Sequence, residues 1–208
     1  MKKTIWMPLV IGGALGLLDF LSLAANFLIP LGPRIATGPQ EVFLIMSAAL
    51  GGPLGLLVAT LLRELGGSIF FLNSQFSPEQ MLSTGLLFAT ADLAAHLLAL
   101  LAVAYCYGFL FTRVKKLYAF FAGWFLIVVV YYILLAVLQS IMIGLVITGI
   151  PPLPALFRNN MLEFLVVLII STLIWIALPA RYHKPLWIEL QPISSPRADG
   201  DGKTEVHV

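Results

Sequence analysis

The sequence contains little charge and a single cysteine, and both shortages exclude whole classes of protein. Only 11% of its 208 residues are charged, far below the roughly 25% of an ordinary soluble domain. The formal net charge of +2 is too small to indicate nucleic-acid binding. The lone Cys106 excludes an internal disulfide and a multi-cysteine metal site. With a mean hydropathy of +0.99, the chain is predicted to be an integral membrane protein.

Catalytic motifs are also missing from the sequence. It contains no Gly-x-Ser-x-Gly, no His-Glu-x-x-His and no phosphate-binding loop. No polar stretch is long enough to form a soluble kinase or cyclase domain. We therefore expect a protein that is not an enzyme and that needs no cofactor.

Long apolar runs are what the chain has in abundance. At 1.5 Å per helical residue, a run of about 20 residues crosses the bilayer core. We predict an all-α, polytopic transmembrane helical bundle of about five spans, over residues 5–30, 40–62, 80–111, 117–148 and 159–178. The first run, which follows Lys2 and Lys3, also has features of a secretory signal.

The remaining segments complete this organisation. Residues 68–72 form an apolar piece that is too short to span, so a re-entrant or interfacial segment is expected there. Residues 1–190 are predicted to form a single transmembrane domain. The polar tail over residues 191–208 is predicted to be disordered.

The stretch over residues 37–71 organises the rest of the chain. We interpret it as one membrane-spanning helix that is interrupted at its centre by Gly-Gly-Pro-Leu-Gly. Proline removes a backbone donor, and such a break is tolerated in lipid only where protein or water satisfies the freed carbonyl groups. This helix is therefore expected to face protein or a cavity. The residues given a structural role are Gly51, Gly52, Pro53, Gly55, Gly66 and Gly67.

Few ionisable side chains fall inside the predicted spans, and these are the first candidates for function because burying them in lipid is costly. Asp92 and His96 are four residues apart and share one helix face. Asp19 lies at a similar depth in the first span, so the three could meet. Asn26 and Gln139 are neutral polar companions.

Three interpretations of these polar groups remain open. They could form a structural hydrogen-bond network, a ligand-binding cavity or a proton relay. A metal site is not expected, because one histidine and two carboxylates are in prospect and no second histidine lies at helical spacing.

Arg63 and Glu64 follow the central interruption and can be interpreted in two ways. They could be a solvated helix end, or Arg63 could bind an anionic ligand at the mouth of a cavity. Glu41 and Arg34 are interpreted as an interfacial pair. The candidate ligand-binding residues are therefore Asp19, Asn26, Arg63, Glu64, Asp92, His96 and Gln139.

An odd number of spans places the two termini on opposite sides of the membrane. The clustered basic residues Arg113, Lys115 and Lys116 favour a cytoplasmic location for the side that they share with the C-terminus. We expect a multi-pass protein of the inner (cytoplasmic) membrane, with its N-terminus outside and its C-terminus in the cytoplasm.

The pattern PQEVFLIMSAALGGPLGLLVATLLRELGG resembles the central helix of the LytS-type five-transmembrane receptor domain. Members of that family are the membrane input modules of some histidine kinases and diguanylate cyclases. The resemblance implies a module that senses or binds a small molecule. Because no effector domain follows residue 178, it would signal through a separate or missing output partner.

A second resemblance is to the substrate-binding S component of energy-coupling-factor transporters, which take up vitamins and other micronutrients. These proteins are also small and apolar, and a separate ATPase module drives them. In that case Gly12, Gly13 and Gly16 would allow close contact with the partner. The expected partners are therefore the lipid bilayer, an unidentified small molecule, and a kinase, cyclase or ATPase protein, with no nucleic acid. A membrane scaffold without a ligand is the third alternative.

Overall fold

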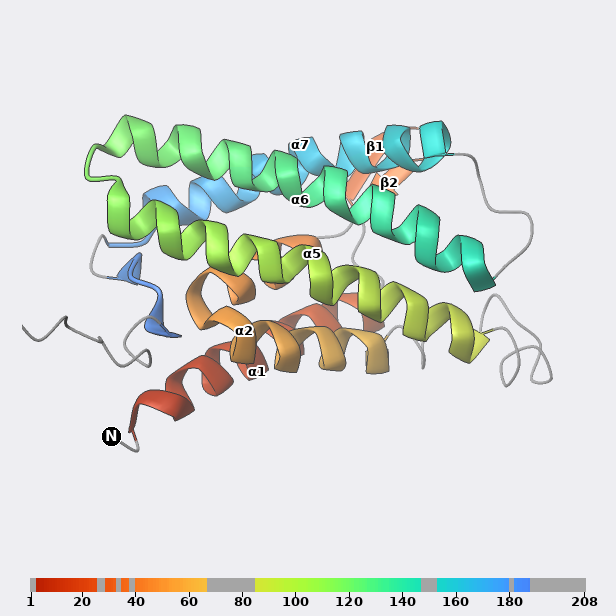
Figure 1. The fold of residues 1–208 in the computed structure, drawn as a ribbon, viewed down its shortest axis with the longest axis horizontal. Coiled ribbons are helices and arrows are strands. Elements are labelled where there is room, and N and C mark those ends of the chain that lie inside the picture. The colour runs from red at the N-terminus through yellow and green to blue at the C-terminus, as the bar shows by residue number, and fades with distance from the viewer. Residues whose placement is uncertain are drawn as a thin grey trace, which may run out of the picture.

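The computed structural model describes residues 3–25, 29–32, 35–37, 40–66, 85–146, 153–179 and 182–187. Five long helices dominate this part of the chain (Figure 1): α1 (Lys3–Ala24), α2 (Gln40–Gly66), α5 (Leu86–Arg113), α6 (Leu117–Val146) and α7 (Leu153–Ala177). Between α1 and α2, the antiparallel strands β1 (Ile29–Gly32) and β2 (Ile35–Thr37) pair, with Ile29 opposite Thr37. The sequence predicted only a loop there.

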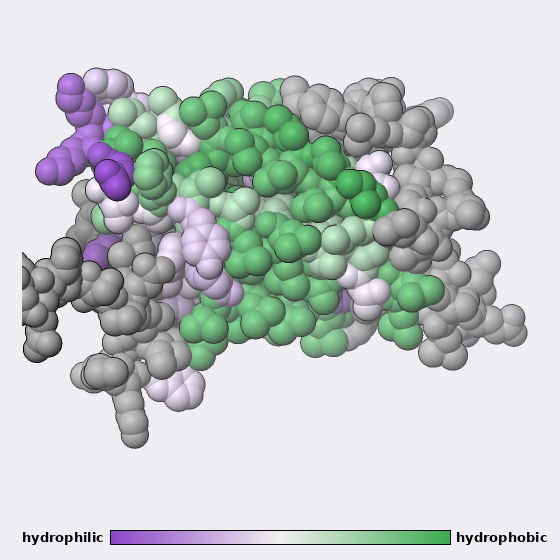
Figure 2. All heavy atoms as spheres, viewed as in Figure 1, coloured by the Kyte–Doolittle hydropathy of each residue, from purple (hydrophilic) through white to green (hydrophobic). Residues whose placement is uncertain are grey.

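The predicted all-α bundle of membrane-spanning type is confirmed. In the described residues, four helices are long and apolar enough to cross a membrane: α1, α2, α5 and α6. Apolar side chains cover the middle of the molecular surface in Figure 2, as expected for a face in contact with lipid. The predicted short segment over residues 68–72 and the polar tail over residues 191–208 lie outside the described residues.

Helix α2 is broken at its centre and folds back on itself. Gly52 has φ +60° and ψ −153°, a conformation outside the helical region, and Pro53 follows it. In a straight helix, residues 41 and 63 would lie about 33 Å apart. Instead, an Arg63 guanidinium nitrogen lies 2.9 Å from a carboxylate oxygen of Glu41. The two halves of α2 are therefore antiparallel.

This bend changes how α2 can lie in a membrane. Each half is about 18 to 21 Å long, too short to cross a hydrocarbon core of about 30 Å. In Figure 1, α2 runs toward one end of the bundle, turns and returns. The prediction of one continuous span over residues 40–62 is corrected accordingly: α2 is a helical hairpin.

Helix α1 packs against the second half of this hairpin through small residues. A Cβ atom added to Gly12 would lie 2.7 Å from the Cα of Gly55, and one added to Gly16 would lie 2.7 Å from the Cα of Ala59. Real side chains do not fit at such distances, so the two backbones are in direct contact. Gly12 and Gly16 thus make contacts within the chain, with Gly55 and Ala59 of α2. Gly13 has open space around it.

The part of the core that α5, α6 and α7 form near the turn from α5 to α6 is aromatic. The ring of Tyr107 stacks on Trp175, with centroids 5.1 Å apart, and Trp124 meets Trp175 edge to face at 5.4 Å. The Tyr107 hydroxyl donates to the backbone carbonyl of His183 at 2.7 Å. Trp124 donates to the Ser171 hydroxyl at 3.1 Å. These contacts fix the chain after α7 against α5.

The two ends of the described chain lie at the same end of the bundle. The tip of the α2 hairpin sits between them: a Cβ on Gly51 would lie 3.2 Å from the Pro8 carbonyl oxygen, and one on Gly52 would overlap the Trp187 ring. Figure 1 shows the start of α1 and the end of α7 on the same side. Helix α2 turns back at Gly52 and so returns the chain to the end of the bundle from which it came.

Candidate functional site

Ionisable side chains from three helices gather near the open end of the α2 hairpin. We call this group the mouth cluster, and it consists of Asp19 on α1, Glu41, Arg63 and Glu64 on α2, and Asp92 and His96 on α5. The bend at Gly52 places the first and last turns of α2 side by side. Glu41 and Arg63 therefore meet although they lie far apart in the sequence.

Glu41 is the centre of the cluster and is only 3% exposed. One carboxylate oxygen pairs with Arg63 at 2.9 Å and lies 3.4 Å from Nε2 of His96. The other oxygen accepts a hydrogen bond from the hydroxyl of Tyr131 on α6. A buried carboxylate needs such donors, because desolvation without partners costs several kcal/mol. Glu41 thus links the two halves of α2 to α5 and α6.

Asp92 and His96 share one face of α5, as the sequence predicted. Nδ1 of His96 lies 2.9 Å from the backbone oxygen of Asp92 and 3.4 Å from its carboxylate oxygen Oδ1. The side-chain amide of Gln139 on α6 donates to the same carboxylate oxygen at 2.8 Å. The prediction that Gln139 accompanies these residues is thereby confirmed in geometry. Two helices hold Asp92 in a fixed orientation.

Asp19 is fully buried on α1, with 0% of its surface exposed. It lies within electrostatic range of Arg63, Glu41, His96 and Glu64, as expected from its predicted depth. Neither carboxylate oxygen has a hydrogen-bond partner among the described residues. Nη1 of Arg63 and Nε2 of His96 are likewise buried without a hydrogen bond to the described protein.

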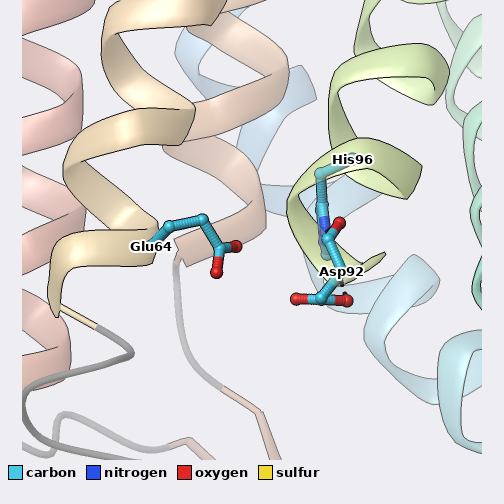
Figure 3. Close-up of side chains that lie close together, drawn as sticks. All are labelled: Glu64, Asp92 and His96. Atoms are coloured by element: carbon cyan, nitrogen blue, oxygen red, sulfur yellow. Dashed lines mark hydrogen bonds and ion pairs between the residues drawn. The ribbon is translucent and has the colours of Figure 1, made fainter. Parts of the chain in front are cut away.

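Glu64 is partly buried, as are Arg63 and Asp92. In Figure 3 its carboxylate extends from α2 toward Asp92 and His96 on α5. One ligand atom from each of these three side chains lies within 4.8 Å of the other two. Arg63 and Glu64 are adjacent in sequence, yet Arg63 turns to Glu41 while Glu64 faces α5.

The mouth cluster contains more acidic than basic side chains. Four carboxylates, those of Asp19, Glu41, Glu64 and Asp92, face one guanidinium and one imidazole. Arg63 already pairs with Glu41, so its charge is largely used within the protein. Buried carboxylates without a partner attract cations and hydrogen-bond donors.

These contacts correct one interpretation of the sequence and leave another untested. Arg63 is 19% exposed and paired to Glu41, so it is not a solvated helix end. Glu41 pairs with Arg63, whereas its predicted partner Arg34 lies outside the described residues. Asn26 and Gly67 also lie outside them, and Gly66 is the last residue of α2.

Glu41 and Tyr131 are the site residues that the sequence did not indicate. Glu41 stands in the first turn of α2, where a carboxylate is common because it suits the helix dipole. Tyr131 is one of many aromatic residues on α6. The only available signal was the Gly-Gly-Pro interruption, which marks a bend without giving its direction.

Comparison of the chain with protein-family models, with curated proteins and with solved structures finds no match.

Proposed function

We propose that this chain is a membrane-embedded binding module that takes a small ligand into the mouth cluster and communicates its presence to a separate protein partner. The observation that carries the proposal is Asp19, a fully buried carboxylate with no hydrogen-bond partner among the described residues. An unsatisfied buried polar group costs roughly 1 to 3 kcal/mol, and more where it is charged. Such a cost is expected where a ligand provides the missing contact.

A purely structural network accounts for only part of the cluster. The pairs Glu41 with Arg63 and Asp92 with Gln139 satisfy each other and join helices. Asp19 makes no such contact with the described side chains, so it does not add to the network as the others do. We therefore assign the Glu41–Arg63 pair to structure and Asp19, with the remaining members of the cluster, to binding.

The expected ligand is cationic or rich in hydrogen-bond donors. This differs from the anionic ligand that Arg63 alone had indicated, because Glu41 already neutralises Arg63. The remaining carboxylates have only His96 to balance them within the cluster. The ligand would thus remove a charge imbalance that the protein leaves open.

The tip of the α2 hairpin offers a connection to a partner. Trp187 covers Gly52 at this tip and stands just before the C-terminal tail. A shift of the hairpin on binding would therefore reach the C-terminal segment through one contact. Together with the resemblance of α2 to the LytS-type receptor domain, this contact supports a sensing role with a kinase or cyclase as partner.

A screen of thermal stability tests the binding proposal. Purified full-length protein would be heated in detergent with panels of cationic, neutral and anionic small molecules. A ligand at 100 times its Kd adds about 2.7 kcal/mol to the stability. We expect at least one cationic or donor-rich compound to raise the melting temperature, and Asp19→Asn to abolish the shift.

Glu163→Gln is the matched control, because α7 contributes no residue to the mouth cluster. This variant should keep the ligand-induced shift. The proposal fails if no compound in the panel stabilises the protein, or if Asp19→Asn responds as fully as the wild type.

A transport subunit is the second candidate, and the broken helix α2 favours it. Discontinuous helices whose ends lie inside the membrane are common around the substrate sites of transporters. The S component of energy-coupling-factor transporters is the relevant class. Co-purification from native membranes separates the two candidates: an ATPase module among the bound proteins supports transport, and a kinase or cyclase supports sensing.

The cytoplasmic membrane is the proposed location, with both termini inside. Most basic residues of the described chain lie at the end of the bundle that holds both chain ends: Lys3, Arg113, Lys115, Lys116 and Lys184. Figure 2 shows the hydrophilic residues gathered where α5 passes into α6. Arg158, in the early turns of α7, belongs to the opposite end. This asymmetry favours a cytoplasmic location for the basic end.

A further inference from the structure

Three side chains of the mouth cluster have the composition and spacing of a metal site. Glu64 comes from α2, and Asp92 and His96 come from α5, one helical turn apart (Figure 3). One ligand atom from each lies within 4.8 Å of the other two. Donors bound to one Zn²⁺ ion at about 2.1 Å lie about 3.4 Å apart in a tetrahedral site. Small side-chain rotations therefore bring the three onto one ion.

The surroundings of His96 point independently to a ligand. Histidines that bind metals usually donate their second ring N–H to a carbonyl or carboxylate, which fixes the tautomer. Nδ1 of His96 lies 2.9 Å from the backbone oxygen of Asp92, which is suited to that bond. Nε2 then carries the lone pair. This atom faces α2, lies 3.4 Å from a Glu41 carboxylate oxygen in a side chain that is 1% exposed, and makes no hydrogen bond to the described residues.

Asp92 is also held in the manner of a metal ligand. Gln139 donates to one of its carboxylate oxygens at 2.8 Å, so the orientation of the carboxylate is fixed from a third helix. Such outer contacts typically change metal affinity by 10- to 100-fold when they are removed.

The charge balance of the cluster distinguishes a bound metal ion from the simpler alternative of a protonated His96. An imidazolium between Glu41 and Asp92 would satisfy both ring nitrogens. It would still leave four carboxylates, those of Asp19, Glu41, Glu64 and Asp92, facing only the two positive charges of Arg63 and His96. A divalent cation neutralises two carboxylates at once and uses the lone pair of the neutral imidazole.

We propose that Glu64, Asp92 and His96 bind one divalent transition-metal ion, and that Zn²⁺ is the best match to one imidazole nitrogen and two carboxylate oxygens. The inference rests on the proposed function, since it names the class of ligand that the mouth cluster takes. Glu64 was not expected in such a site because it comes from a different helix, so spacing along one helix could not reveal the group.

Metal binding to the purified full-length protein tests the inference. The protein in detergent would be stripped with a chelator, equilibrated with ZnCl₂ and desalted, and its bound zinc measured by mass spectrometry. We expect one ion per chain. His96→Ala, Asp92→Asn and Glu64→Gln should each weaken binding by at least about tenfold, and Gln139→Ala by about 10- to 100-fold.

Cobalt provides a readout that a merely structural role would not change. Co²⁺ bound to nitrogen and oxygen ligands absorbs visible light, and the spectrum should change in His96→Ala. His183→Gln is the matched control: His183 lies beyond α7, where Nε2 is 3.0 Å from the Trp175 and Leu178 carbonyl oxygens. This variant should bind zinc and cobalt as the wild type does.

Folding is checked separately by size-exclusion chromatography and circular dichroism. Glu64→Gln keeps the test valid if the more buried variants do not fold, because Glu64 is only partly buried. The inference is overturned if the stripped protein binds no zinc, or if folded Glu64→Gln binds it as tightly as the wild type. If either of these results is found but the small-molecule screen is positive, the metal site is overturned and the proposed function is still supported.

Discussion

Glu41 illustrates how much a single side chain depends on the fold around it. Its carboxylate joins Arg63 on the same helix, Tyr131 on α6 and His96 on α5. Asp92 and His96 could be predicted as neighbours because four residues separate them on one helix. Glu41 and Arg63 could not, because their contact depends on the direction of a bend between them.

Removing the Arg63 charge should destabilise the protein strongly. Arg63→Met leaves Glu41 buried beside a neutral side chain, and breaking a buried pair in this way costs about 3 to 5 kcal/mol. Unfolding in detergent, followed by circular dichroism, measures the loss. The double variant Arg63→Met with Glu41→Gln should recover part of it, because no uncompensated carboxylate remains.

Arg113→Met is the control for this prediction. Arg113 stands at the end of α5, with its guanidinium 5.6 Å from the Phe109 ring centroid. A substitution at such a surface position should change stability by no more than about 0.5 kcal/mol. If Arg63→Met is equally mild, then Arg63 and Glu41 do not form a buried pair in the membrane.

Helix α2 shows how much of a single helix a sequence pattern can predict. Apolar runs predicted the helices to within a few residues at most ends, because hydrophobicity and length decide whether a segment crosses the bilayer. The Gly51 to Gly55 interruption gave the position of the break. It could not give the positive φ at Gly52 or the return of the chain, since these are fixed by packing against Pro8, Gly12 and Trp187.

Gly52 should therefore be the least replaceable residue of the hairpin. Gly52→Ala introduces a side chain at φ +60° and against the Trp187 ring. Strain at such a backbone conformation costs on the order of 1 to 3 kcal/mol, and the overlap adds to it. We expect a lower melting temperature, measured by differential scanning fluorimetry.

Two further variants separate the causes of this loss. Gly52→Ala combined with Trp187→Ala should regain the part that is due to overlap and keep the part that is due to backbone strain. Gly13→Ala is the control, because nothing lies within 4 Å of a Cβ at that helical position. It should be neutral or stabilising by up to about 1 kcal/mol. Equal effects at Gly13 and Gly52 would argue against the bend.

At the scale of the whole molecule, the bend in α2 brings the two ends of the described chain to the same end of the bundle. By length and composition α1, α5 and α6 can each cross a membrane, whereas α2 turns back on itself at Gly52. Counting apolar runs in the sequence gave an odd number and opposite termini. Hydropathy records how long an apolar segment is and not whether it reverses direction, so this count treats α2 as one continuous span.

Single-cysteine labelling tests this topology. In a Cys106→Ser background, Lys3→Cys and Lys184→Cys should resist a membrane-impermeant maleimide in intact cells and react after permeabilisation. Arg158→Cys should react in intact cells. If the Lys3→Cys and Lys184→Cys variants differ in their accessibility, the chain ends lie on opposite faces and α2 crosses the membrane.

The aromatic core gives the protein a built-in optical reporter. Trp124 and Trp175 lie 5.4 Å apart with their ring planes at 81°, and the stacked Tyr107 adjoins Trp175. Chromophores this close and this rigidly crossed couple their electronic transitions, which gives strong near-ultraviolet circular dichroism. Each of α5, α6 and α7 contributes one ring. The signal therefore reports how these three helices sit against one another, in native membranes or detergent, without any attached dye.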